Sequence, residues 1–200
     1  RHIDPHQYLH SRGEITRNFL ASKQTAQAYL DSLPFSQYAG FNGLFYDGAT
    51  LAYCHYGASS RPEIAILNEG IYGLSNAKLD SPWPKVEKTK AALQTLNQNL
   101  EHEHVANKLF NILRDDTQAD DNLLPDTGIG IEFERLLSPA FIISPSYGTR
   151  TSSTLIINQE TSGQTAYFKE RQFSNKGEIL RELSKQLTVD FPSFFSKRIS

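Results

Sequence analysis

The amino-acid sequence predicts an α+β protein built on antiparallel sheets, and three stretches carry that prediction. Apolar residues alternate over residues 41–46 and 51–56, with an Asp-Gly turn between the two runs. Between residues 84 and 113 the apolar spacing changes to three and four, which is typical of helices. Alternation returns after residue 150. The short turns favour antiparallel pairing over parallel strands joined by crossover helices.

Two helices are predicted ahead of the first strand. Residues 11–14 read Ser-Arg-Gly-Glu, a capping box in which the serine accepts from the backbone and the glutamate reaches back to it. An apolar stripe follows over residues 15–20. A second short helical pattern covers residues 26–33, and Pro34 ends it because proline cannot continue a helix.

The next segment is predicted to be an antiparallel meander. Its hairpin contains Cys54, which we interpret as a small buried hydrophobe, because alternation places its basic neighbour His55 on the opposite face. Two more apolar runs, residues 63–67 and 71–74, are predicted strands. The second run stops at the pair Ser75-Asn76, so we expect the Asn76 carboxamide at a strand end, in a loop that leads to the only tryptophan.

The second half of the chain is predicted to contain three helices and then strands. Ser81 is the expected cap of the first helix, with Pro82 in its first turn. A second helix ends at Leu113 and a short third one covers residues 131–137. Strands are predicted over residues 140–144, 154–158 and 165–169.

The last segment shows apolar residues at helical spacing. Ile179, Leu180, Leu183 and Leu187 fit one face of a helix, so residues 176–200 are predicted to form an amphipathic helix and a tail. Residues 1–175 are predicted to form the main domain, since no Pro-rich or Gly/Ser-rich linker divides them.

Composition excludes several classes of function. A net charge of -2 with mixed signs gives no attraction to nucleic acid, and no apolar run is long enough to predict an integral membrane segment. A single cysteine excludes an intrachain disulfide and a thiolate zinc cluster, which favours a reducing, cytoplasmic location. His2, His6 and His10 recur every four residues, but Pro5 opposes a helix there, so no metal site is predicted.

Five short motifs share their order and spacing with one known family. They are Ser11-Arg12-Gly13, Gly40-Phe41-Asn42, Tyr72-Gly73-Leu74-Ser75-Asn76-Ala77, Pro82-Trp83-Pro84-Lys85 and Tyr147-Gly148-Thr149-Arg150-Thr151. On these motifs the chain resembles the Transport and Golgi organisation 2 (TANGO2) family, also called the NRDE family, from about residue 1 to Phe173.

The resemblance implies a fold and an incomplete N-terminus. The family is similar to the N-terminal-nucleophile (Ntn) hydrolases, in which two antiparallel sheets are sandwiched between helical layers in an αββα arrangement. In the family pattern a cysteine follows the initiator methionine and an Asn-Arg-Asp-Glu motif comes shortly after it; this sequence has neither, and no methionine. We therefore expect the family's N-terminal segment to be missing, with the presumed nucleophile upstream of Arg1.

The resemblance also implies site residues. Cysteine-nucleophile relatives such as penicillin V acylase and bile salt hydrolase use a later asparagine and arginine, and Asn76 and Arg150 occupy similar positions. A carboxamide can donate to the oxyanion of a tetrahedral intermediate, and a guanidinium favours a thiolate. We expect Asn76 and Arg150 to be catalytic, and their motif neighbours Ser75, Trp83 and Tyr147 to bind the substrate.

Both proposed catalytic residues also have purely structural alternatives. Asn76 can tie down the loop before Trp83. Arg150 can pair with Glu170 or Glu134 in the sheet region. The sequence leaves these alternatives open.

Two classes of function follow from the resemblance. The first is an Ntn-type C–N hydrolase that acts on a small acyl-amide, with Asn76 in the oxyanion hole. The second is a non-catalytic protein that traffics haem or a lipid such as acyl-CoA. No cofactor is predicted, and haem enters only as a ligand of the second class, for which the candidate axial ligands are His2, His6, His10 and His55. The expected partner is a small-molecule substrate, or a haem or lipid ligand.

Overall fold

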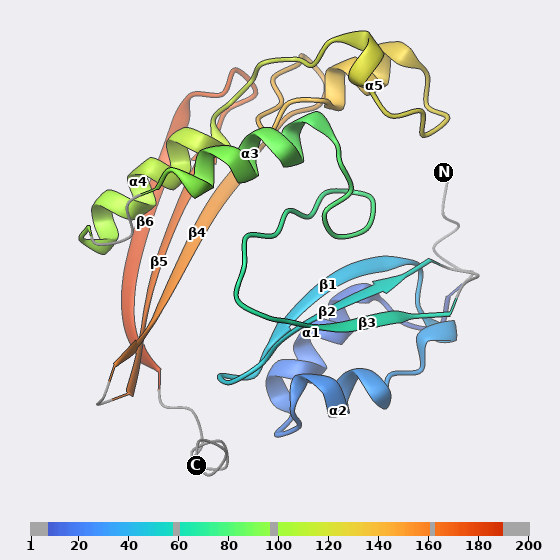
Figure 1. Ribbon diagram of the computed structural model, residues 1–200, viewed down its shortest axis with the longest axis vertical. Coiled ribbons are helices and arrows are strands. Elements are labelled where there is room, and N and C mark those ends of the chain that lie inside the picture. The colour runs from blue at the N-terminus through green and yellow to red at the C-terminus, as the bar shows by residue number, and fades with distance from the viewer. Residues whose placement is uncertain (1–7, 58–60, 97–99, 161–162, 190–200) are drawn as a thin grey trace. The chain divides into compact units, whose positions relative to one another are not determined.

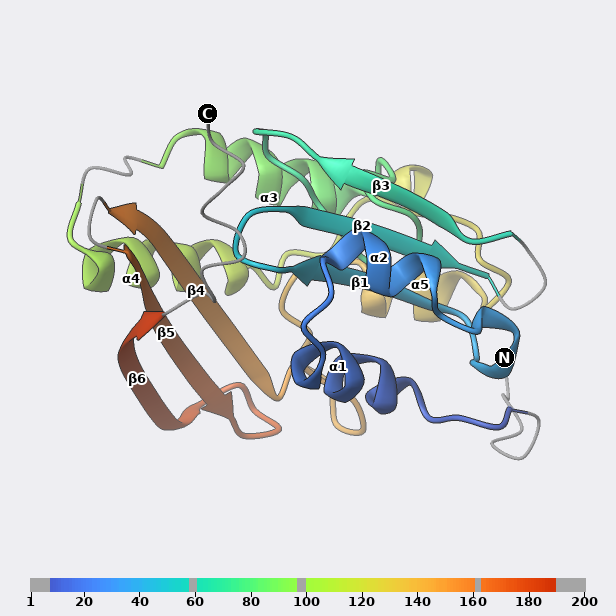
Figure 2. The ribbon, with the colours of Figure 1, turned by 90° about the horizontal axis from the view of Figure 1, so that it is seen from below.

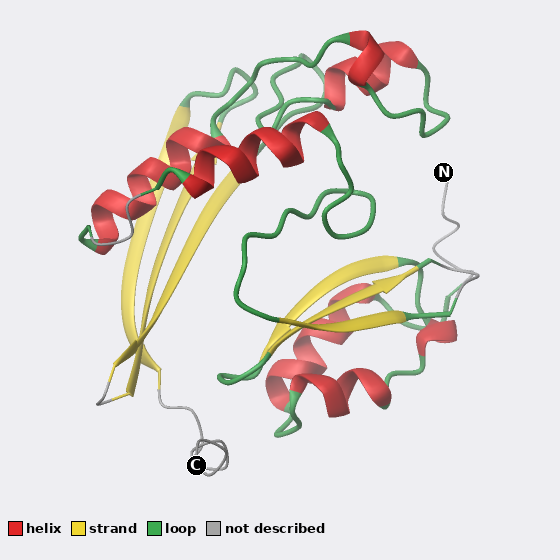
Figure 3. Cartoon of the chain, in the orientation of Figure 1, coloured by secondary structure: helices red, strands yellow, loops and turns green. Residues whose placement is uncertain are grey.

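The computed structural model describes residues 8–57, 61–96, 100–160 and 163–189. Contacts within the chain group these residues into two compact units, each of which is described by itself. Unit 1 comprises the described residues up to Gly70, and unit 2 those from Ile71 onward. Figure 1 labels the elements of both units, and Figure 3 marks their helices and strands.

Unit 1 is a three-stranded antiparallel sheet with two helices on one of its faces, as Figure 2 shows. Its elements are α1 (Arg12–Ala21), α2 (Ala26–Asp31), a 3₁₀ turn (Phe35–Gln37), β1 (Phe41–Tyr46), β2 (Leu51–Tyr56) and β3 (Glu63–Leu67). The strand order is β1-β2-β3, so each strand pairs with the next along the chain. The predicted helices, hairpin and following strand are confirmed.

Local hydrogen bonds fix the starts of these elements. The predicted capping box at α1 is present, with the Ser11 backbone N–H donating to Glu14 Oε1 at 3.2 Å. The hairpin turn is closed by Asp47, whose Oδ1 accepts from the Thr50 N–H at 2.8 Å. These side chains satisfy backbone donors that would otherwise lack a partner at an element boundary.

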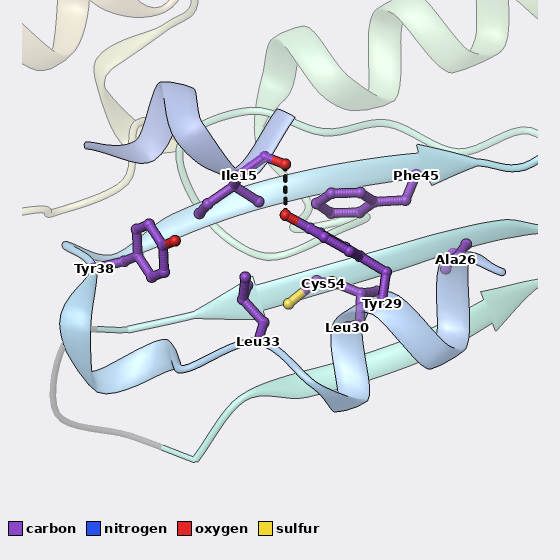
Figure 4. Close-up of a cluster of buried hydrophobic side chains, with 9 residues drawn as sticks. Ile15, Ala26, Tyr29, Leu30, Leu33, Tyr38, Phe45 and Cys54 are labelled. Atoms are coloured by element: carbon purple, nitrogen blue, oxygen red, sulfur yellow. Dashed lines mark hydrogen bonds between the residues drawn. The ribbon is translucent and has the colours of Figure 1, made fainter. Parts of the chain in front are cut away.

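The core of unit 1 is almost entirely apolar, as Figure 4 shows. Tyr29 contributes its ring and donates its hydroxyl to the Ile15 carbonyl at 2.7 Å, so its one polar group is satisfied. Cys54 is fully buried in this cluster, as predicted. Burial raises the pKa of the Cys54 thiol to about 11, so at neutral pH the group is a packed thiol and no nucleophile.

Unit 2 combines a second three-stranded antiparallel sheet with three α-helices in its described part. Its elements are α3 (Pro84–Gln94), α4 (His102–Leu113), a 3₁₀ turn (Asp121–Leu123), α5 (Ile131–Leu137), β4 (Thr151–Glu160), β5 (Gly163–Phe173) and β6 (Ile179–Val189). The strand order is β4-β5-β6. Helix α4 packs on the sheet, where Lys169 of β5 lies 2.5 Å from Glu103 of the helix.

The predicted C-terminal helix is wrong over the residues that the structure describes; residues 190–200, which include the predicted tail, lie outside them. Residues 179–189 form strand β6, which pairs with β5 from Gln164 to Phe173. The physical reason is that the backbone of this segment pairs with β5 and that Glu182 finds cations there, with Arg171 at 2.6 Å and Lys169 at 3.0 Å. Meanwhile Ile179, Leu180 and Leu187, which set the apparent helical stripe, are exposed.

Three smaller predictions are also wrong. Residues 71–74 are not a strand, because the Gly73 N–H donates to the Asp80 carboxylate and not to a neighbouring strand. Residues 140–144 contribute only an isolated bridge between Ile143 and Gly148. Ser81 does not cap α3; Trp83 holds the cap position with Pro84 in the first turn.

The coarse prediction, antiparallel sheets combined with helices, is confirmed by the two described sheets. Among the described residues no helix has both the length and the apolar character needed to cross a bilayer.

Candidate functional site

Asn76 lines a pocket of about 240 Å³ in unit 2. The other polar groups around it include Lys85 and Glu134, which come from α3 and α5. Its apolar walls are formed by Trp83, Pro84, Pro125, Ile129 and Leu137. A concave, largely apolar space with a few convergent polar groups is the usual form of a small-molecule site.

The loop that carries Asn76 is held by Asp80. The Asp80 N–H donates to the Gly73 carbonyl at 2.7 Å, and the Gly73 N–H donates back to Asp80 Oδ1 at 2.8 Å. Lys90 of α3 donates to the same oxygen at 2.7 Å, and this hydrogen bond is the main cause that lowers the pKa of Asp80. Asp80 has a φ of 55°, in the left-handed region that aspartate tolerates better than most residues.

Gly73 lets this loop lie directly on helix α3. A Cβ at this position would stand 2.5 Å from Val86 Cγ1, closer than real contacts allow, and Val86 is buried. Any larger residue would therefore push the loop away from the helix. Gly73 therefore allows the loop that carries Asn76 to pack closely against α3.

The Asn76 side chain is exposed, and it makes no hydrogen bond to any residue in the part of the chain that the structure describes. The predicted structural alternative, a carboxamide that ties the loop down, is therefore a role that Asp80 fills instead. The Asn76 amide keeps two N–H donors and a carbonyl acceptor for a ligand in the pocket.

Lys85 brings a positive charge to the pocket, and contacts with Leu137 and Trp83 hold its ammonium group. Its Nζ donates at 2.7 Å to the carbonyl of Leu137, the last residue of α5. The same Nζ lies 5.7 Å from the centroid of the Trp83 ring. Burial lowers the pKa of the Lys85 ammonium, and the nearby Glu134 charge acts in the opposite direction. One of its three donors is used by Leu137, which leaves the others for a ligand.

Glu134 is a carboxylate that is only 7% exposed. Its Oε1 accepts from both the N–H and the hydroxyl of Thr127, at 2.7 Å and 2.5 Å. Lys85 and Glu134 are both described, and no direct ion pair joins them. A cation and an anion thus line one pocket without forming an ion pair with each other. This arrangement suits a ligand that both donates and accepts hydrogen bonds.

Three predicted site residues lie elsewhere in unit 2. Ser75 is half-buried beside Asn76 but does not line the pocket, and Tyr147 is 56% exposed and does not line it either. Arg150 is exposed and also stands outside the pocket lining. Among the described residues it pairs with neither Glu134 nor Glu170. Asn76 and Trp83 therefore line one pocket, and Ser75, Tyr147 and Arg150 do not line it.

Sequence reasoning missed Lys85 and Glu134 as pocket residues. Lys85 ends the Pro-Trp-Pro-Lys motif, so a cation two residues after a tryptophan at a helix start is a usable signal. Glu134 lies three residues from both Ile131 and Leu137, so it shares one face of the helix with two apolar residues, and Glu134 and Leu137 both line the pocket. A lone carboxylate on an apolar stripe was the signal there.

The described residues provide neither a metal cluster nor a haem ligand at this pocket. No group of three or more metal-binding side chains occurs among them. Of the candidate axial ligands, His2 and His6 lie outside the described residues. His10 contacts Glu14 at 3.0 Å, and His55 contacts Asn42 at 2.8 Å, both in unit 1.

Comparison with known proteins identifies relatives over most of the chain. Residues 1–175 match the family model described as Transport and Golgi organisation 2. The Transport and Golgi organization 2 homolog of Mus musculus is 28% identical over 180 residues, which is 82% of this chain and 63% of that protein. The Transport and Golgi organization protein 2 homolog of Homo sapiens is 30% identical over 161 residues, 74% of this chain and 58% of the relative. The chain thus spans about three-fifths of the length of these relatives.

Proposed function

This chain belongs to the Transport and Golgi organisation 2 family, and we propose that its Asn76 pocket is the substrate side of a cysteine-nucleophile C–N hydrolase that acts on a small acyl-amide. One observation carries the proposal: the Asn76 carboxamide lines the pocket and makes no hydrogen bond to any described residue. The proposal includes the Ntn-type αββα sandwich that the resemblance implies.

The pocket offers each part of an amide a partner. The Asn76 N–H groups can donate to the carbonyl oxygen, whose negative charge grows as the tetrahedral intermediate forms, and the Lys85 ammonium adds a positive charge nearby. The Glu134 carboxylate can accept from the amide N–H. The apolar walls suit the acyl chain.

The proposed reaction needs a thiolate from outside the described residues, because Cys54 is fully buried and protonated at neutral pH. That thiolate attacks the carbonyl carbon and forms a C–S bond. Collapse of the intermediate breaks the C–N bond, and the amine leaves with a proton. Water then hydrolyses the thioester to a carboxylic acid and restores the thiol. We assign Arg150 the role of stabilising the thiolate by its positive charge. Its guanidinium is exposed and has no carboxylate partner among the described residues.

The test uses the protein expressed from its complete reading frame. A β-lactone probe is expected to acylate one cysteine, and an acyl p-nitroanilide is expected to be hydrolysed. Asn76→Ala should lower kcat/KM by about 10²-fold or more, the usual cost of one oxyanion donor. Asn122→Ala, the same change at an exposed asparagine outside the pocket lining, should leave it unchanged. Absence of labelling, or equal losses in the two variants, would contradict the proposal.

A carrier of a lipid or acyl-CoA is the second candidate, and one observation favours it. The pocket joins apolar walls to the Lys85 ammonium, which could hold an anionic head beside an acyl chain. The haem version lacks similar support, because no described histidine lines this pocket. Saturable binding of a fatty acid without turnover of any amide would favour the carrier. A Soret shift that saturates on haem titration would favour the haem version.

A cytoplasmic location is also part of the proposal. It rests on the single cysteine of the chain, which is buried as a thiol. Fractionation of cells that express the complete protein tests it.

A further inference from the structure

We propose that a second pocket in unit 2 binds the phosphate group of a phosphomonoester. The pocket has a volume of about 190 Å³ and shares no lining residue with the Asn76 pocket. It lies where the end of α4 meets β4 and β5, and its polar lining includes Arg114, Arg171 and Ser152. Behind these groups stand three buried aromatic rings: Phe110, Phe141 and Phe173.

Arg114 follows the last turn of α4, and its guanidinium is held in one place. Its Cζ lies 3.8 Å from the centroid of the Phe141 ring and 5.6 Å from that of Phe173. Its Nη2 donates to the Gly177 carbonyl at 2.8 Å. Gly177 has a φ of 78°, and a Cβ there would stand 3.0 Å from both terminal guanidinium nitrogens. The turn therefore needs glycine in order to receive the arginine.

Arg171 is fixed on the other side by similar contacts. Its Cζ lies 4.3 Å from the centroid of the Phe110 ring. Its Nε donates to Glu182 at 2.6 Å and its Nη2 to Asn107 at 3.0 Å. Two of its three guanidinium nitrogens are thus used, and Nη1 remains for another acceptor.

Several donors at this pocket have no acceptor within the described residues. Arg114 uses only Nη2 and faces no carboxylate at ion-pairing distance there. The half-buried Ser152 hydroxyl likewise has no hydrogen bond to a described residue. By contrast, Arg135 on α5 pairs with Asp121 at 2.7 Å and Glu132 at 2.8 Å. The charge of Arg171 is paired with Glu182, whereas that of Arg114 has no carboxylate partner among the described residues; the pocket therefore presents one unpaired guanidinium, the free Arg171 Nη1 and the Ser152 hydroxyl.

This donor set fits a tetrahedral oxyanion better than a planar one. Two guanidiniums from different elements and a hydroxyl can each reach a different oxygen of a phosphate, whereas a carboxylate has only two oxygens to offer. Stacking on the aromatic rings pre-orients the guanidiniums, so little rotamer entropy is lost on binding. The chemistry is the same for a soluble phosphomonoester and for a phosphatidic acid headgroup.

Calorimetric titration of the whole chain with glycerol 3-phosphate tests the inference. We expect saturable one-site binding that Arg114→Ala weakens at least about tenfold, the effect of losing one charge-assisted hydrogen bond. Arg17→Ala on α1 removes the same charge outside the pocket lining and should change the affinity by less than about twofold. Ser152→Asp keeps a side chain on β4 but supplies its own carboxylate, so it should abolish binding while thermal unfolding stays cooperative.

Two further measurements decide the ligand class and its source. Acetate should bind more weakly than glycerol 3-phosphate; equal affinity would overturn the assignment to phosphate. Binding to phosphatidylcholine vesicles only when they contain phosphatidic acid, with loss in Arg114→Ala, would identify the lipid headgroup as the source and support the site. No saturable binding in either format would overturn the inference, as would equal losses in Arg114→Ala and Arg17→Ala. None of these results depends on activity at the Asn76 pocket.

Discussion

The two sheets have the same strand order but differ in what joins them to their helices. In unit 1, α1 and α2 meet the sheet through apolar side chains, and Tyr29 supplies one internal hydrogen bond (Figure 4). In unit 2, α4 also buries apolar side chains, Val105, Ala106 and Phe110, but charges join it to β5 as well: Lys169 is only 3% exposed and lies between Glu103 at 2.5 Å and Glu182 at 3.0 Å. The same strand order therefore occurs with an apolar helix–sheet interface and with one that also holds buried ion pairs, and only the ion pairs respond strongly to salt and acid.

Each unit carries its own unique probe. The single cysteine, Cys54, is buried in the core of unit 1, so its reaction with a thiol reagent reports the opening of that unit. The single tryptophan, Trp83, lines the Asn76 pocket, so its fluorescence reports unit 2. The comparison can therefore be tested in one chain without added labels.

The largest effect is expected from Leu30→Ala in unit 1. Leu30 is fully buried, and its truncation should cost about 3 kcal/mol in the free energy of unfolding, through lost burial and a residual cavity. Denaturant unfolding followed by Cys54 reactivity should give the same loss at low and high salt. Leu20→Ala on α1, at a site that is 76% exposed, should cost less than about 0.5 kcal/mol. If the stability loss of Leu30→Ala becomes smaller at high salt, the contrast between an apolar unit 1 and a charged unit 2 is contradicted.

A smaller, salt-dependent effect is expected from Lys169→Met in unit 2. The change keeps the buried stem and removes the charge, which leaves two half-exposed carboxylates without their cation. We expect a loss of about 1–2 kcal/mol by Trp83 fluorescence, reduced because the carboxylates can rehydrate. Lys108→Met, on the exposed side of α4, is the matched control. If the Lys169→Met loss is unchanged in molar salt, ion pairing does not hold this sheet.

Acid should weaken unit 2 through Glu103. Hydrogen bonds from Lys169, and then from the Tyr167 hydroxyl, lower the pKa of Glu103 from 4.5 to about 2. A carboxyl with a lowered folded-state pKa contributes stability that is complete above about pH 4.5 and is lost as the pH falls towards 2. The stability difference between the parent chain and Glu103→Gln should therefore be constant at neutral pH and shrink below pH 4.5. A difference that grows in acid would contradict this assignment.

The smallest effect is expected from Asp80→Asn in the loop that carries Asn76. The substitution keeps an acceptor for the Gly73 N–H but removes the charge that faces Lys90, a partly exposed pair worth roughly 0.5 kcal/mol. The expected result is a changed Trp83 emission with little change in overall stability. Glu87→Gln, a charge loss on exposed α3 surface, should leave the emission unaltered.

The sequence predicted unit 1 better than unit 2, for a physical reason. Apolar alternation and helical spacing describe burial, and burial is what holds unit 1 together. Strand β6 was predicted as a helix because Leu180 and Leu187 fit a helical stripe, yet both are exposed. Strand β6 pairs with β5 along its backbone, and Glu182 of β6 adds ion pairs to Lys169 and Arg171; periodicity carries no information about such cross-strand charges.

The candidate site shows the same division. The family motifs that point to Asn76 and Trp83 are local stretches of the chain, and both residues line one pocket, although the strand predicted before Asn76 does not form. Glu134 comes from a helix 58 positions after Asn76 in the chain, and only tertiary packing brings the two to one cavity. A single sequence contains no direct signal for such a contact.

The assignment of the Asn76 pocket as the ligand site is tested most directly by titrating the chain with hexanamide while Trp83 fluorescence is recorded. A saturable change is expected, because Trp83 lines the pocket. Asn76→Ala should weaken the affinity by up to about tenfold, since the bound carbonyl loses its donor. Asn122→Ala should leave the affinity as it is. No saturable change, or equal affinity in the parent chain and Asn76→Ala, would contradict the assignment.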